Sequence, residues 1–344
     1  MATTELDRSS TGNHFRLGLL FAISSALAFG SSGPFAKALI EAGWSPTGAV
    51  TARLAGGAVA MALFASFVRP GWVGEAVRHA RTVISYGLVP IAGAQLCYYN
   101  AVAHLSVAVA LLLEYTAPIL VVGWVWATTR RRPSSMTFAG AGLAVAGIML
   151  VLNVFSGAHI NIIGVAWALA AAVCAVCYFV MSNNVSTDGD GLNPISLASG
   201  GLIVGATAVA LLGVTGVMPL TFTTNPVVIA GFTTSWLVPV ITLGLIPTAL
   251  AYTLGIFGIA RLKPRFASLV GLSEVMFAVL FAWILVGEAM TVSQAIGGTV
   301  VLLGLALARQ GDRSEQASPD SAGQVELAGW PDMPLRETTE PAND

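Results

Sequence analysis

The most informative side chains of this chain are four ionisable groups that lie inside long apolar stretches. They are Lys37, Arg53, Glu114 and Glu274, and these stretches contain no Asp. A charge inside the hydrocarbon of a membrane costs several kcal/mol on most scales, so each group is a candidate for solute binding or proton transfer. The sequence therefore predicts a site for a charged or zwitterionic solute within a membrane.

The depths of these groups suggest how they interact. At 1.5 Å per helical residue, Arg53 lies about 10 Å and Glu114 about 12 Å from the same outer face, so we predict an ion pair. This pair either neutralises its own charges or binds a zwitterion or carries protons. Lys37 lies near the outer face, where its side chain can reach the interface. Glu274 lies near the midplane, about 13 Å from the inner face, and we expect it to be protonated, hydrogen-bonded or solvated by a cavity.

Polar and aromatic residues gather in the same stretches as the charges. Gln95 and Tyr99 are four positions apart, as are Thr248 and Tyr252, so each pair shares a helix face. We predict a central polar cavity, and the alternative is hydrogen bonding between helices. The predicted substrate-binding residues are Gln95, Tyr98, Tyr99, Asn100, Glu114, Tyr115, Thr248, Tyr252 and Glu274, with Thr116 beside them.

Composition places these residues in an integral membrane protein. Hydrophobic residues make up 56% and charged residues 10% of the chain, and the mean hydropathy is +0.79. So few polar side chains cannot coat a soluble domain of 344 residues. The net charge of −1 gives no general attraction to nucleic acid. We expect no metal or cofactor, and we interpret the Cys174–Cys177 pair as two small packing residues.

Apolar runs of membrane-spanning length predict an all-α fold of ten transmembrane helices. The first run resembles a cleavable secretory signal, but it continues to Ile40, which favours a retained helix. Lys and Arg fall only in alternate loops, including Arg130–Arg132, whereas loops such as Ser156–His159 have none. Because basic loops face the cytoplasm, both termini are predicted to be cytoplasmic. The predicted helices are 16–39, 47–67, 83–103, 106–128, 136–155, 161–182, 195–217, 237–259, 266–286 and 291–308.

A repeat explains how these helices are organised. Residues 87–150 align without a gap with 244–307, and Pro90 matches Pro247. Basic residues occur at opposite ends of the two copies, which predicts two inverted halves, 16–155 and 160–309, between tails 1–15 and 310–344. The matched prolines should kink both halves alike. Small residues such as Gly142, Gly147, Gly201 and Gly205 should allow close helix contact.

The same residues resemble a known family. The Leu-Glu-Tyr-Thr-Ala-Pro run at 113–118, the Trp-Ile-Leu-Val-Gly-Glu run at 283–288, and Lys37 with Arg53 are similar to patterns of the EamA family of the drug/metabolite transporter superfamily. The resemblance covers about residues 16–309 and is strongest to bacterial exporters of the threonine and homoserine type. It implies ten helices and export of small metabolites. Two departures are Val275, where relatives often have Pro, and Arg130–Arg132, where the first repeat commonly ends in Gly-Glu.

These observations predict a secondary transporter in the cell membrane that exports a small polar metabolite, such as an amino acid, by alternating access. Protons are a candidate coupling ion, and the oligomeric state is left open. A multidrug exporter of the same superfamily is one alternative, and a membrane scaffold or receptor that transports nothing is another. An enzyme is disfavoured because the sequence has neither a Gly-x-Ser-x-Gly nor a His-Glu-x-x-His motif.

Overall fold

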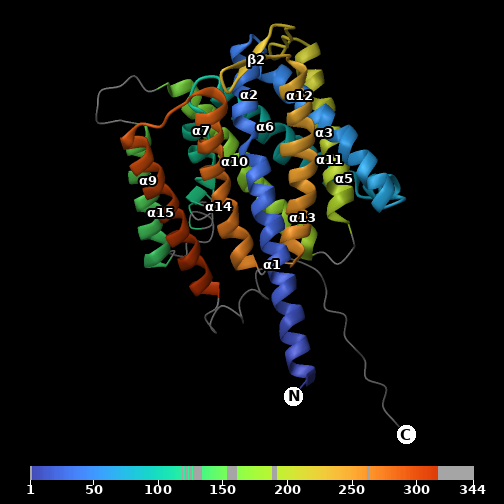
Figure 1. Cartoon of the computed structure of the whole chain (residues 1–344), viewed down its shortest axis with the longest axis vertical. Helices are drawn as coiled ribbons and strands as arrows, with labels where there is room; N and C mark the ends of the chain where they lie inside the picture. Colours follow the sequence, from blue (N-terminus) through green and yellow to red (C-terminus); the bar gives the residue numbers. More distant parts are fainter. Residues whose placement is uncertain are drawn as a thin grey trace.

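The computed structural model is a bundle of long helices whose axes follow the long axis of the molecule (Figure 1). It describes residues 2–117, 119–120, 123, 126, 134–152, 161–187, 192–261 and 264–316. Several residues named above lie outside these ranges, namely Pro118, Arg130–Arg132, Ser156–His159 and the tail from residue 317.

Helices lie in all of the stretches that hydropathy predicts. Each of the ten predicted ranges contains helix, although α1 begins at Ala2, so the predicted amino-terminal tail is helical as well. Two features were not predicted: the short helix α4 and a hairpin, β1–β2. The elements are α1 (Ala2–Gly30), α2 (Ser32–Glu41), α3 (Pro46–Val68), α4 (Trp72–Arg78), α5 (Ala80–Tyr86), η1 (Gly87–Gly93), α6 (Ala94–Val102), α7 (Val107–Glu114), α9 (Ser135–Val151), α10 (Ile162–Thr187), α11 (Pro194–Val214), β1 (Val227–Ile229), β2 (Phe232–Thr234), α12 (Leu237–Gly244), η3 (Leu245–Leu250), α13 (Ala251–Arg261), α14 (Pro264–Phe281), η4 (Ala282–Val286) and α15 (Val292–Gln316).

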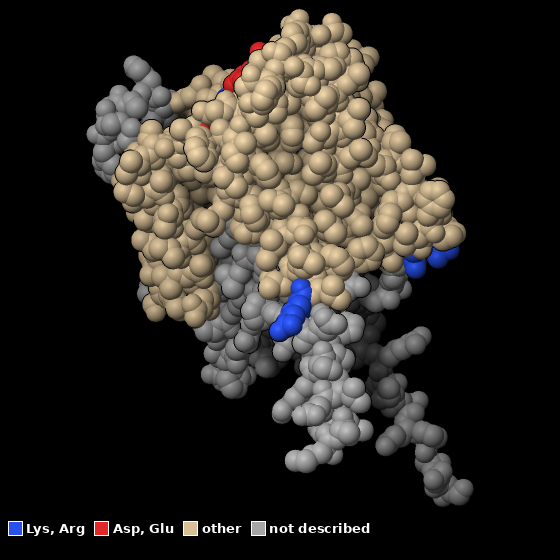
Figure 2. All heavy atoms as spheres, viewed as in Figure 1, with Lys and Arg blue, Asp and Glu red and all other residues tan. Residues whose placement is uncertain are grey.

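The outside of the bundle is apolar, as a lipid-facing surface must be. Large side chains such as Phe67, Ile162 and Val292 are more than three-quarters exposed. Within the described residues, four stretches are long and apolar enough to cross a membrane, namely Arg16–Glu41, Pro46–Val68, Pro194–Val214 and Leu237–Gly255. In Figure 2, Lys and Arg side chains lie toward the end from which α1 starts, and Asp and Glu side chains show near the opposite end.

Local sequence signals explain where several helices begin. Ser45, Ser106 and Ser134 each accept a hydrogen bond from the backbone N–H three residues later, and so cap α3, α7 and α9. Asn193 caps α11 in the same way through Ile195 N–H. Pro46 and Pro194 follow their caps, at a position where a missing N–H costs nothing.

The first apolar stretch is broken between α1 and α2. Ser31 separates the two helices, and its hydroxyl donates to the carbonyl of Ala28 at 2.7 Å. Pro34, three residues further on, has no N–H to continue the helical ladder. The break turns the hydroxyl of Ser32 toward Tyr99 OH, 3.2 Å away, which places polar groups in the middle of the bundle.

Pro90 and Pro247 lie in matching π-helical segments, η1 and η3. A proline removes one backbone donor and pushes against the preceding turn, and a wider turn relieves both effects. The prediction that the two matched prolines distort their helices alike is therefore confirmed, in that both lie in a π-helical segment.

Helices α9 and α15 meet through glycines that match in the repeat. A Cβ on Gly140 would lie 2.6 Å from the carbonyl oxygen of Gly304, and one on Gly147 would lie 2.8 Å from that of Gly297. Since the earlier glycine of each helix meets the later one of the other, the two helices run antiparallel. Gly142 has nothing within 4 Å of an added Cβ, so its predicted packing role is wrong.

The hairpin covers the end of the bundle opposite the start of α1 (Figure 1). Val227 pairs with Thr234, and Ala230 and Gly231 both have positive φ, as a tight two-residue turn requires. Trp44 holds the loop before the hairpin, because its indole N–H donates to the carbonyl of Thr223 at 2.8 Å. This loop therefore ties the α2–α3 connection to the second half of the chain.

Candidate functional site

Arg53 is the centre of a buried polar cluster that joins four elements of the bundle, α2, α3, α6 and η3. Its side chain is 2% exposed. The guanidinium donates to Thr248 Oγ1 at 3.1 Å and to the carbonyl of Pro247 at 3.2 Å, both in η3. From the other side it donates to Ser32 Oγ, Gln95 Oε1 and Tyr99 OH, in α2 and α6. Arg53 therefore connects the first half of the chain to the second.

The backbone explains why Arg53 can reach η3. Gly57 lies one helical turn after Arg53, on the same face of α3, and a Cβ there would approach Thr248 Cγ2 to 2.2 Å. Only a glycine allows α3 and η3 to lie this close. Pro247 cannot donate to the carbonyl of Leu243, so the Thr248 hydroxyl does so at 2.8 Å and keeps a lone pair for Arg53.

The structure does not place Arg53 and Glu114 within ion-pair distance, so their pairing stays a prediction. Among the described residues, ion pairs within 4 Å join Lys37 with Glu288 and Arg69 with Glu75. Equal depth in two helices does not give the rotation of either helix, and Arg53 faces the neutral oxygens of α2, α6 and η3. An arginine can satisfy its charge with several such oxygens because it has five donors in one plane.

The two membrane carboxylates differ from each other. Glu274 accepts a hydrogen bond of 2.7 Å from the Tyr115 hydroxyl, which links α14 to the end of α7. Glu114 is half-buried and has no hydrogen-bond or ion-pair partner among the residues that the structure describes. Because Tyr115 follows Glu114 directly, both carboxylates lie beside the same α7–α14 contact.

The remaining predicted residues have more local roles. Asn100 donates to the carbonyl of Leu96 in its own helix at 2.7 Å, and Thr116 donates in the same way to Leu113 at 2.6 Å. The Tyr98 ring is buried beside that of Tyr99, with ring centroids 5.9 Å apart. The Tyr252 ring meets Phe29 edge to face at 5.2 Å. The structure thus brings Gln95, Tyr99 and Thr248 together at Arg53 and leaves the others outside that cluster.

Lys37 belongs to a separate contact at the end covered by the hairpin. Its ammonium group lies 3.4 Å from the Glu288 carboxylate, and their side chains are 16% and 21% exposed. It also donates to the carbonyls of Val102 at 2.9 Å and Leu105 at 3.3 Å. Glu288 in turn accepts from the backbone N–H of Val107. The pair joins α2 to the loop after η4, one from each half of the chain.

Sequence reasoning missed Ser32 and Glu288 as partners. Ser32 carried a weak signal, because the Ser-Ser-Gly-Pro run at 31–34 predicts a helix break, where side-chain hydroxyls become available. Glu288 follows Gly287, whose φ of 75° ends η4. A buried lysine requires an acidic partner at its own depth in the membrane. A search of the sequence for such a residue could have indicated Glu288.

Comparison with known proteins gives the same classification in both halves of the chain. The model of the EamA-like transporter family matches residues 16–153 and 162–310. The threonine/homoserine exporter RhtA of Salmonella typhimurium is 27% identical, over 80% of this chain and 84% of its own length. YwfM of Bacillus subtilis, an uncharacterised transporter, is 24% identical over 64% of this chain and 71% of its own.

The fold has a counterpart of known structure. One crystal structure of a protein aligns with 88% of this chain and 98% of its own, at a TM-score of 0.56 and 19% identity. That likeness concerns the fold alone. The family match spans most of the sequence. The apolar exterior and the matched π-helical segments η1 and η3 agree with it. The chain belongs to the EamA-like transporter family, whose members are multi-pass membrane proteins that move small molecules.

Proposed function

We propose that this protein is a secondary transporter that exports a small polar metabolite, an amino acid in the first instance, by alternating access. In this proposal ten helices form two inverted halves, 16–155 and 160–309, and both termini are cytoplasmic. The likeness to a threonine/homoserine exporter over 80% of the chain supports the substrate class. The substrate contacts Glu114 and the polar groups near it.

The inverted arrangement has support from two places in the bundle. The glycine contacts between α9 and α15 are reciprocal, which is the pattern expected when a twofold axis relates two helices. The π-helical segments η1 and η3 hold matched prolines. Inverted repeats of this kind let one half rock against the other around a fixed site.

The observation that carries the proposal is the unpartnered carboxylate of Glu114. A charged carboxylate away from water is costly unless it is paired. The described residues satisfy Arg53 and give Glu274 a hydroxyl donor, but they offer nothing to Glu114. A substrate ammonium group or a proton would remove this cost. Exchange of one for the other would couple export to the proton gradient.

Transport into sealed vesicles tests this proposal. The full chain is reconstituted, a pH gradient is imposed, and labelled threonine and homoserine are offered. We expect accumulation of an amino acid above equilibrium in the wild type. Downhill movement without accumulation would refute proton coupling. Movement of aromatic cations in place of amino acids would favour a multidrug exporter, and movement of neither would favour a scaffold or receptor.

Labelling of single cysteines tests the orientation. In a background without Cys97, Cys174 and Cys177, we introduce Arg131→Cys or Gly157→Cys and treat intact cells with an impermeant reagent. We expect reaction at 157 and protection at 131. Labelling at position 131 in intact cells would overturn the assignment of the termini.

A further inference from the structure

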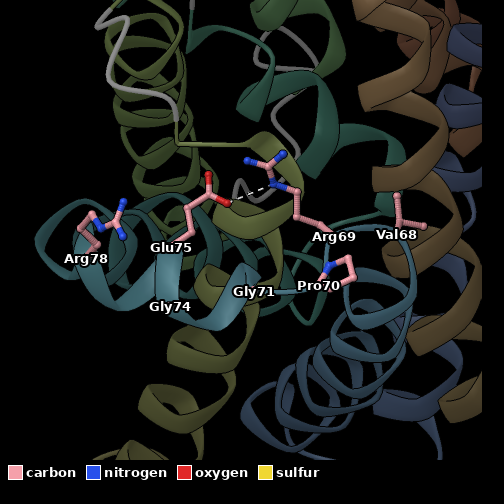
Figure 3. A pocket seen from close by; sticks show the side chains of 7 residues that line it. All are labelled: Val68, Arg69, Pro70, Gly71, Gly74, Glu75 and Arg78. Carbon is pink, nitrogen blue, oxygen red and sulfur yellow. Dashed lines mark hydrogen bonds and ion pairs between the residues drawn. The ribbon is translucent and has the colours of Figure 1, made fainter.

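A cavity of about 430 Å³ lies at the end of α3 where the chain turns into α4, apart from the Arg53 cluster (Figure 3). The short connection is shaped by Gly71, whose φ of 98° requires a residue without a side chain. Arg69 and Arg78 lie on either side of Glu75 in this view. The lining consists of Val68, Arg69, Pro70, Gly71, Gly74, Glu75 and Arg78.

The carboxylate of this cavity is already used. Glu75 accepts from the backbone N–H of Asn193 at 2.6 Å, from Ser196 Oγ at 2.8 Å and from Arg69 Nε at 3.2 Å. Burial alone raises the pKa of Glu75, but these hydrogen bonds outweigh it and hold the pKa below its usual range. Glu75 therefore remains an anion that fastens α4 to the start of α11.

The two arginines of the cavity make fewer hydrogen bonds and ion pairs than Glu75 does. Arg78 is exposed and makes no hydrogen bond or ion pair with any residue in the described part of the chain. Arg69 contributes only its Nε to Glu75, and its side chain is 47% exposed. Two guanidinium groups therefore face one small cavity whose single acid is already bound, so the cavity favours an anion.

Exposed apolar side chains lie next in the sequence to the residues that line this basic cavity. Phe67 is 85%, Val73 55% and Val77 68% exposed. Val73 and Val77 are four apart and share one face of α4, whereas Trp72 is buried and its indole N–H donates to Ser66 Oγ. Basic groups beside exposed apolar side chains are typical of the boundary between headgroups and acyl chains.

We propose that this cavity binds the phosphate of an anionic phospholipid headgroup, with its acyl chains along Phe67, Val73 and Val77. Guanidinium groups bind phosphate oxygens through paired hydrogen bonds. Free phosphate has the same chemistry, but it would leave the apolar rim without a function. The position of the cavity directly after the membrane-length helix α3 places it at the level of lipid headgroups. A lipid held here would fix α4 and the α3–α11 contact during transport.

Binding of short-chain lipids to the purified full chain tests the proposal. Dioctanoyl phosphatidylglycerol, dioctanoyl phosphatidylcholine and inorganic phosphate are each titrated. Bound lipid is counted by native mass spectrometry, and the unfolding temperature is recorded. We expect saturable binding of phosphatidylglycerol that raises the unfolding temperature. Its affinity should fall about fivefold in Arg78→Gln, as expected for one basic group near an anionic lipid.

Arg81→Gln is the matched control, because Arg81 is exposed in the neighbouring helix α5 and does not line the cavity. Its affinity should stay at the wild-type value. We replace Arg78 and not Arg69, because Arg69→Gln would also remove a hydrogen bond to Glu75. Equal binding of phosphatidylcholine, unchanged affinity in Arg78→Gln, or the same thermal shift with phosphate alone would each overturn the proposal. The readout is independent of the transported solute.

Discussion

Arg53 and Glu114 are both charged groups in the apolar interior of one bundle, yet their surroundings are opposite. Arg53 is almost fully buried and its guanidinium donates to oxygens of α2, α6 and η3. Glu114 ends a helix whose other residues, from Val107 to Leu113, are apolar and buried. A guanidinium can use neutral oxygens, which helices supply readily, whereas a carboxylate needs donors, which a run of Val, Ala and Leu cannot supply. We therefore propose that Arg53 stabilises the fold and that Glu114 binds the substrate.

Replacing Arg53 should have the largest effect on stability. Hydrogen bonds to a charged group are each worth about 1.5–3 kcal/mol. Arg53→Gln removes several of them and leaves the Pro247 carbonyl without this donor. We expect a loss of about 3 kcal/mol or more in the free energy of unfolding. Thermal unfolding in detergent measures it, with Arg81→Gln as the exposed control. A loss no larger than that of the control would contradict a structural role.

A double change sharpens the comparison. If Arg53 and Glu114 do not touch, the losses in Arg53→Gln and Glu114→Gln should add within about 0.5 kcal/mol. If the double variant is instead clearly more stable than that sum, the two groups pair directly in solution.

Replacing Glu114 should affect transport far more than stability. Glu114→Gln removes a charge that has no partner in the described protein, so we expect unfolding within about 1 kcal/mol of the wild type. Transport should fall at least about tenfold, the effect of ~1.4 kcal/mol of lost binding, and a pH gradient should no longer concentrate the substrate. Vesicle transport and thermal unfolding are measured on the same preparation.

The matched variant is Glu274→Gln, whose amide oxygen can still accept from Tyr115. If Glu114→Gln concentrates substrate normally and Glu274→Gln does not, the coupling residue is Glu274. The functional group to compare with Arg53 is then Glu274 and not Glu114.

The Lys37–Glu288 pair is an intermediate case, in which both charges have partners and both are partly exposed. Lys37→Met also removes donors from the carbonyls of Val102 and Leu105, so it should cost more than Glu288→Gln, which can still accept from Val107 N–H. A double-mutant cycle of thermal stabilities should give a coupling energy of about 1 kcal/mol, at the upper end for exposed pairs. A coupling energy of zero would show that the pair does not hold the two halves together.

The sequence predicts the periodic and one-dimensional features of this fold well. Apolar run length places the helices, and Pro90 and Pro247 mark the π-helical segments, because a missing N–H acts locally. Gly147 was predicted as a packing residue because it is small, and it does contact Gly297. Gly142, on the same helix, is small yet faces open space, since residue size does not reveal which helix face is covered.

Contacts that depend on helix rotation or loop path could not be predicted in the same way. Arg53 and Glu114 share a depth but not a direction. The hairpin was missed because its strands are three residues each and Ala230 is an unusual residue for positive φ. The pairing of Lys37 with Glu288 depends on how helix α2 and the distant loop after η4 meet, which a single sequence does not encode locally.

Replacing Glu75 should have the smallest effect on stability. This carboxylate has hydrogen-bond partners, which Glu114 lacks. Because hydrogen bonds from Asn193, Ser196 and Arg69 outweigh the effect of burial, its pKa in the folded state lies below the ordinary value of 4.5. A group with a lowered folded pKa stabilises the fold above its unfolded pKa and loses that contribution as the pH falls through the folded value. Glu75→Gln should therefore lower the unfolding temperature at pH 7. The difference in unfolding temperature from the wild type should become progressively smaller below pH 4.5. Salt should weaken only the part due to Arg69, which is exposed. An equal loss at both ends of this pH range would show that Glu75 acts through packing and not through its charge.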